Sequence, residues 1–118
     1  MAGLNNTGKN LMLDGFAASA LYVSLHSADP GSTGTSEITG GSYARQAASW
    51  GAASDATLSN DTAIVFNVAG TTTINHLGYW SANTGGTFYG SVQLDAEQTF
   101  ATPGTYTIAI GNLTESVT

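Results

Sequence analysis

The chain has no cysteine, few charged residues and no long apolar run, and each absence excludes a class of protein. Without cysteine it can form neither a disulfide framework nor a thiolate metal site. Charged residues make up 8% of the chain, against about 25% in an ordinary soluble domain. The stability of the folded chain must therefore come from apolar packing and backbone pairing.

Positive charge is especially scarce. Lys9 and Arg45 are the two cationic residues, and the formal net charge is -6. We expect no nucleic-acid partner and no membrane partner, because phosphate groups and anionic lipids attract clusters of lysine and arginine. No apolar stretch is long enough to span a bilayer. The N-terminus also lacks the basic and apolar segments of a signal peptide, so we expect synthesis in a bacterial cytoplasm.

What the chain does contain is apolar residues and neutral polar ones. Hydrophobic residues make up 42% of the sequence, which is too many for a disordered acidic tail. The surface must then be covered by Ser, Thr, Asn, Gly and Ala. Bringing such a surface against a partner removes few charges from water. This composition favours a subunit of an assembly over a free monomer.

The length and the turn signals indicate one mainly β domain covering residues 1–118. Residues 1–18 are expected to form a short N-terminal helix or an extended arm, with Leu11, Met12 and Phe16 at helical spacing. Asn6 or Thr7 would cap this helix. Residues 19–118 are expected to form an antiparallel β-sandwich or a jelly-roll-like barrel.

Alternating apolar residues place the strands of this sandwich. They are predicted at residues 21–26, 43–50, 63–68, 72–82, 87–94, 105–110 and 113–117, with a short edge strand at 56–59. The 72–82 alternation puts Ile74 and His76 on one face and Leu77 and Tyr79 on the other. The last two strands are expected to flank a turn at Gly111-Asn112.

No catalytic, cofactor or metal site is predicted. His26 and His76 lie on different strands, without further ligands at metal-binding spacing. Asp29 and Glu37 flank a long loop that lacks the alternating acidic ligands of calcium loops. Asp95 and Glu97 could be paired carboxylates, but two exposed charges after a hairpin are the simpler interpretation. A small hydrolase would need a cleft in which a histidine meets an acid and a nucleophile.

Two further features concern recognition and pairing. The aromatic residues Tyr79, Trp80, Phe88 and Tyr89 could line a sugar-binding face, although cross-strand packing explains them more simply. The lone arginine, Arg45, is expected to pair with a carboxylate such as Asp29 or Glu37, either within the domain or across a subunit boundary.

Four motifs, taken in order, carry a family resemblance. They are NTGKNLMLD at residues 6–14, VSLHSADPG at 23–31, GGSYARQ at 40–46 and GYWS at 78–81 with a Thr-Gly-Gly hairpin after it. Together they resemble a family of small virion structural proteins of actinobacterial and related tailed phages, described as minor tail or tail-fibre-like proteins. The resemblance implies a virion component without enzymatic activity. Its partners would be major capsid or tail proteins and copies of itself.

The sequence therefore leads to an oligomeric surface component of a phage particle, located either on the capsid as a decoration protein or on the tail. The helix or arm and the loop 28–42 are the expected contact regions. The subunit-contact candidates are Leu11, Met12, Phe16, Asp29, Pro30, Glu37 and Arg45. The alternative is a carbohydrate- or host-receptor-binding module at the tail tip, and it requires exposed rings at Tyr79, Trp80 and Tyr89.

Overall fold

The structure is a computed structural model that describes residues 4–116. Residues 1–3 of the expected arm and Val117 of the last expected strand lie outside the described part. The element order is one helix followed by eight strands, so the fold is mainly β as predicted. The molecule is elongated, with principal extents of 47 × 27 × 24 Å.

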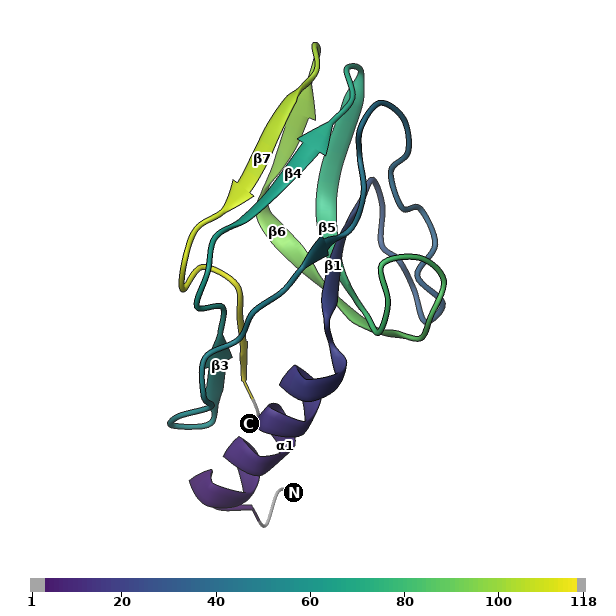
Figure 1. Cartoon of the computed structure of the whole chain (residues 1–118). Coiled ribbons are helices and arrows are strands. Elements are labelled where there is room, and N and C mark those ends of the chain that lie inside the picture. Colours follow the sequence, from purple (N-terminus) through teal and green to yellow (C-terminus); the bar gives the residue numbers. More distant parts are fainter. Residues whose placement is uncertain (1–3, 117–118) are drawn as a thin grey trace.

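The N-terminal helix, α1, spans Asn6–Ser19, which places a helix in the segment 1–18 where a helix or an arm was predicted. The extended-arm alternative is wrong for these residues. The capping residue is Asn5 instead of Asn6 or Thr7, because its side-chain oxygen accepts a hydrogen bond from the Gly8 N–H at 3.0 Å. Figure 1 shows α1 below the sheets, beside β3.

Four strands form the larger antiparallel sheet in the order β2, β1, β5, β6. These strands are β1 (Tyr22–His26), β2 (Gln46–Ala47), β5 (Thr72–Trp80) and β6 (Phe88–Phe100). β1 pairs with β5 from Tyr22 opposite Trp80 to His26 opposite His76. Both faces of β1 are buried from Val23 onwards, since the core covers one face and the loop 28–42 covers the other. The expected half-buried strand is therefore fully covered.

Two further strand pairs complete the fold. β4 (Ile64–Val68) pairs with β7 (Gly104–Ile108), and β3 (Thr57–Ser59) pairs with β8 (Thr114–Ser116). The β4–β7 pair lies in front of the larger sheet in Figure 1. One hydrophobic cluster joins both layers, with Phe66 and Ile108 from the pair and Leu25 and Ile74 from the sheet. This is the predicted sandwich arrangement.

The sequence-predicted strands 43–50, 87–94 and 113–117 need correction. The first shrinks to Gln46–Ala47, and the second extends to Phe100. The last two strands do not pair with each other around Gly111-Asn112. Buried Asn60 accepts a hydrogen bond from the Leu113 N–H at 3.0 Å, and its carbonyl accepts one from the Gly111 N–H. These bonds hold the turn so that the chain crosses to β3.

An irregularity in the pairing of β5 and β6 changes the face of β5 on which Ile74 lies. Ile74 pairs with Gln98 and His76 with Gln93, so Asn75 alone stands opposite the four residues 94–97. This irregular β-bulge, with one residue of β5 opposite four of β6, shifts the side-chain alternation of β5. Ile74 consequently faces the same core as Leu77 and Tyr79, whereas simple alternation puts it on the other face with His76.

Candidate functional site

The loop 28–42 is packed against the sheet. Pro30 is among the fully buried side chains, and Ile38 is buried against the core cluster. The Asp29 carboxylate accepts a hydrogen bond from the Gly31 N–H at 2.9 Å, which closes a local turn. Asp29 is therefore a turn-forming residue. The loop is therefore an ordered cover over the outer face of β1 and β5.

Arg45 is anchored inside this cover by an ion pair with Glu37. Its guanidinium donates from Nε to Oε2 at 3.1 Å and from Nη2 to Oε1 at 3.0 Å, so the pair is bidentate. The side chains of Arg45 and Glu37 are only 8% and 23% exposed. The pairing is within one domain, and the alternative partner Asp29 is wrong.

The same guanidinium connects three parts of the chain. It lies over the Trp80 ring, with 3.7 Å from Cζ to the ring centroid. Its Nη1 donates to the carbonyls of Ala82 and Gly85 at 3.1 and 2.8 Å. Arg45 thus ties the turn after β5 to the loop 28–42.

The charge of Glu37 is stabilised in place. Burial alone would raise the pKa of its carboxyl, but hydrogen bonds from Arg45 and Tyr43 outweigh burial and hold that pKa below its usual value. The Tyr43 hydroxyl donates to Glu37 Oε2 at 2.7 Å and accepts from the Leu25 N–H at 3.0 Å. Burial, with the neighbouring carboxylate, raises the pKa of Tyr43 well above its ordinary value.

Ser24 and His26 form a buried serine–histidine pair beside this ion pair. Ser24 Oγ lies 2.6 Å from His26 Nε2, and it accepts a hydrogen bond from the Trp80 Nε1–H at 2.8 Å. The other ring nitrogen, Nδ1, lies 2.7 Å from the Thr35 carbonyl oxygen. The bonding fits a neutral ring that donates from Nδ1 to Thr35 and accepts the Ser24 hydroxyl proton at Nε2.

This arrangement does not activate a nucleophile. Both side chains are completely buried, and a backbone carbonyl stands where a triad would place a carboxylate. Burial lowers the pKa of His26, which keeps the ring neutral. His26 is therefore a buried strand histidine whose two ring nitrogens both have hydrogen-bond partners within the fold. The Ser24–His26 pair cannot reach a substrate in this structure.

The aromatic residues pack within the fold, as the simpler interpretation of the sequence held, and the alternative of a sugar-binding aromatic face is wrong. Tyr79 and Trp80 are 2% and 8% exposed, and of the four aromatic residues only Tyr89 is strongly exposed, at 43%. The Tyr79 ring packs edge-on against Phe16 at 5.2 Å between centroids, and its hydroxyl donates to Glu115. The tail-tip sugar-binding alternative loses the exposed rings on which it depended.

The outer face of α1 remains open. Leu11 and Met12 are 74% and 54% exposed. Phe16, at the same helical spacing, is packed in the core of its own chain. Of the seven contact candidates, four have side chains engaged within the chain: Phe16, Pro30, Glu37 and Arg45. Asp29 is exposed, but its carboxylate closes a local turn. Leu11 and Met12 are available to a neighbour.

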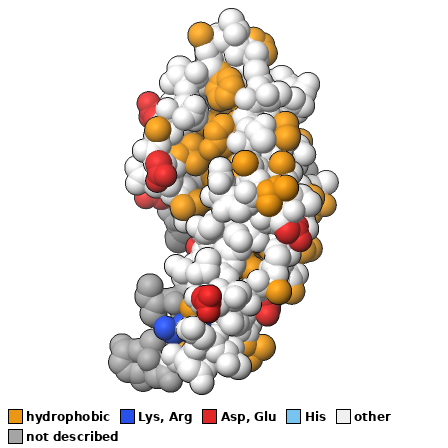
Figure 2. Space-filling view, turned by 90° about the vertical axis from the view of Figure 1, so that its left-hand side faces the viewer, with side chains coloured by type: hydrophobic (Ala, Val, Ile, Leu, Met, Phe, Trp, Pro, Cys, Tyr) orange, Lys and Arg blue, Asp and Glu red, His pale blue; other side chains and the backbone are white. Residues whose placement is uncertain are grey.

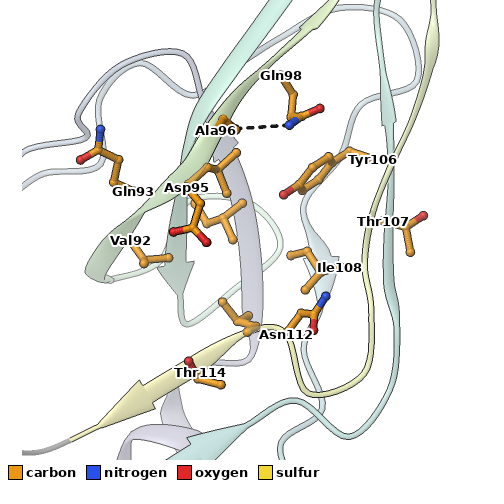
Figure 3. A pocket seen from close by; sticks show the side chains of 13 residues that line it. Val92, Gln93, Asp95, Ala96, Gln98, Tyr106, Thr107, Ile108, Asn112 and Thr114 are labelled. Carbon is orange, nitrogen blue, oxygen red and sulfur yellow. Dashed lines mark hydrogen bonds between the residues drawn. The ribbon is translucent and has the colours of Figure 1, made fainter.

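A groove of about 570 Å³ opens between β6 and β7. Figure 3 shows that β6 and β7 border it on opposite sides. Figure 2, seen from the side that carries β7, shows apolar side chains along a hollow in the upper part, with carboxylates nearby. Its lining residues are Leu77, Val92, Gln93, Leu94, Asp95, Ala96, Gln98, Tyr106, Thr107, Ile108, Asn112, Leu113 and Thr114. No local sequence pattern predicts this groove, because its two walls come together only in the tertiary structure.

The remaining acidic and histidine residues do not converge. Within residues 4–116 no group of three or more His, Cys, Asp or Glu side chains is placed to hold a metal ion. Asp95 and Glu97 are exposed on β6, and the Asn75 amide approaches Glu97 at 3.5 Å. In the same described range no helix combines the length and apolarity that crossing a bilayer requires.

The sandwich commits its buried polar groups to its own packing. Within the described residues no buried side-chain nitrogen or oxygen lacks a hydrogen-bond partner. A charge-poor domain with an exposed apolar helix face has the surface expected of a subunit in an assembly.

A family match identifies the kind of assembly to which the chain belongs. A family model described as podophage GP4 fiber I protein gp80 matches residues 4–116, so the chain belongs to this phage fibre family. It is a tail-fibre-like structural component of the virion. A search of curated proteins found no match.

Proposed function

We propose that this protein is an oligomeric subunit of a phage tail fibre and that α1 makes the contacts between subunits. The observation that carries the proposal is the exposure of Leu11 and Met12 on a helix at one end of an elongated molecule. Large apolar side chains on a rigid surface are typical of interaction sites. The fibre family favours the tail over capsid decoration. Neighbouring tail proteins and copies of this chain are the partners.

The opposite face of α1 holds the helix firmly against the body. Leu13 is buried there. The side chains of Asn10 and Asp14 accept hydrogen bonds from the backbone N–H groups of Ala56 and Ala53 at 2.9 and 3.0 Å. A partner that binds the outer face therefore meets a pre-ordered surface, and association loses little conformational entropy.

Binding of a partner to the outer face of α1 would also remove few polar groups from water. Leu4, which precedes the helix and its capping residue, is exposed as well. Gly15 follows on this side, with open space where a side chain would stand. The face is apolar and low in relief, so it permits close approach of a second backbone.

The test is a Leu11→Gln, Met12→Gln double variant. Fully burying one such side chain contributes about 1.5–3 kcal/mol, so loss of both partly exposed contacts should weaken self-association roughly 30-fold or more. Analytical ultracentrifugation of the full chain measures the association constant, and incorporation into particles is the second measurement. The matched control is Val65→Thr, because Val65 is 49% exposed on β4. Equal association constants for the double variant and wild type would contradict the proposal.

A further inference from the structure

The β6–β7 groove carries polar side chains that the fold does not use. Within residues 4–116, Asp95, Tyr106, Asn112 and Thr114 make no side-chain hydrogen bond, although all four line the groove. Gln98 uses its amide in one long bond, 3.3 Å to the Ala96 carbonyl. These groups supply donors and acceptors to whatever occupies the groove.

The bulge in β6 places several of these groups at the groove. Leu94, Asp95, Ala96 and Glu97 have no Cα partner on β5, and the first three of them line the groove. A bulge of this kind redirects side chains and interrupts the strand edge. Figure 3 shows Asp95 on the β6 side and the Tyr106 ring, from β7, directed into the space between the strands.

The floor of the groove is apolar, and its charge has one sign. Leu77, Ile108 and Leu113 are buried core residues at its base. Asp95 is the one charged residue among the lining side chains, and no lysine or arginine is among them. An anionic ligand would meet a carboxylate without a counter-charge. The amides of Gln98 and Asn112 both donate and accept, which suits neutral hydroxyl groups.

A β-strand from a partner fits this groove less well. The bulge breaks the regular edge that strand addition needs. The exposed charges of Asp95 and Glu97 also oppose pairing, as charged side chains on edge strands generally do. Two copies joined through β6 would bring these carboxylates together, which is unfavourable. The groove is also within the size range of small-ligand sites, roughly 300–1,000 Å³.

We propose that the β6–β7 groove binds a neutral oligosaccharide. The sugar hydroxyls bond to Asp95, Gln98 and Asn112, and the apolar faces of the rings lie against Tyr106 and the apolar floor. This combination of an apolar floor and a few convergent polar groups is the general pattern of ligand sites. The site is separate from the α1 surface. It also differs from the aromatic site considered for Tyr79 and Trp80, because its polar contacts come from amides and a carboxylate.

The experiment is a titration of the ¹⁵N-labelled full chain, followed by amide chemical shifts. The probes are maltotriose, cellotriose and triacetylchitotriose, with 3′-sialyllactose as the anionic comparison. At least one neutral probe should give saturable shifts confined to residues around 92–98 and 106–114. Asp95→Asn should weaken that binding about ten-fold, because it removes a charged hydrogen-bond acceptor. Asn112→Ala should weaken it two- to ten-fold.

Matched controls separate the groove from the rest of the surface. Asp29→Asn removes an exposed carboxylate elsewhere, and Tyr89→Phe alters an exposed ring on β6 outside the groove; both should leave binding unchanged. The amide spectrum of each variant reports whether it folds. Asp95 and Asn112 are exposed, so their substitution should not disturb the core.

Three results would overturn the proposal. One is no shift with any neutral probe at about 50 mM, a concentration at which a site with a Kd of about 1 mM would be almost fully occupied. Another is equal binding of the sialylated probe. The third is a change of the groove amides with protein concentration alone, which would assign the groove to a second copy. None of them bears on the Leu11 and Met12 contacts, so failure here and failure of the fibre-subunit proposal are distinguishable.

Discussion

Glu37→Gln removes the charge that balances the buried Arg45 guanidinium. Breaking a buried ion pair by changing one partner destabilises a protein by about 3–5 kcal/mol. Arg45 keeps its bonds to the carbonyls of Ala82 and Gly85 and its contact with Trp80, which places the expected loss at the lower end. We expect the free energy of unfolding to fall by about 3 kcal/mol. That is a large part of the roughly 5–15 kcal/mol of a typical domain.

Urea unfolding followed by tryptophan fluorescence measures this loss. With an m-value of about 1.5 kcal/mol/M, the midpoint should shift by about 2 M urea. The thermal midpoint should fall by about 10–15 °C. Protein concentration must be fixed, because an oligomer gains stability by mass action. Asp29→Asn is the matched control, since its amide oxygen can still accept from the Gly31 N–H.

The pH dependence gives an independent check. The pKa of Glu37 is held below its usual 4.5 in the folded state, so the unfolded chain binds the proton first as pH falls. The ion pair's contribution is fully present above about pH 4.5 and disappears as pH falls through the folded-state pKa. The difference between wild type and Glu37→Gln should shrink accordingly in acid. A loss under about 0.5 kcal/mol at pH 7, as for an exposed pair, would refute the reasoning.

Three further perturbations test the interior. Gly78→Ala would place its Cβ 2.5 Å from Ser24 Oγ and 2.7 Å from His26 Nε2, so thermal unfolding should show a loss of about 1–3 kcal/mol; an unchanged midpoint contradicts the packing. Asn60→Ala removes a buried side chain that accepts from Leu113 and donates to two carbonyls, and it should lose about 2–4 kcal/mol in urea unfolding. Burial lowers the pKa of His26 below 6.5, so its neutral state stabilises the fold fully above pH 6.5 and less as pH falls towards the folded-state pKa. The difference in free energy of unfolding between wild type and His26→Gln should decline over that range, and a difference that stays constant with pH would contradict this explanation.

Local sequence patterns predicted most secondary elements. Alternation placed the strands that became β1, β4 and β5, and helical spacing placed α1. The helix contacts were harder to predict: Leu11, Met12 and Phe16 share an apolar spacing, but only Phe16 packs into the core. Spacing identifies apolar positions, whereas the body against which the helix docks decides which of them are covered.

The aromatic residues show the same division. Tyr79 and Trp80 were recognisable as a cluster, and the sequence left open whether they face water or a core. Their burial depends on segments far away along the chain. Phe16 covers Tyr79, and Arg45 covers Trp80. Such coverage is a property of long-range packing and leaves no local signal.

The sequence by itself determined that this is a charge-poor, mainly β domain, because composition and short-range alternation can be read without knowing how the chain folds. Its ordered motifs carried the resemblance to a phage structural family. Only the tertiary structure decided that Arg45 pairs with Glu37, that Asn75 faces a bulge, and that β6 and β7 part to leave a groove. These features arise where segments distant in sequence meet. Their geometry follows from the balance of packing and hydrogen bonding across the whole fold.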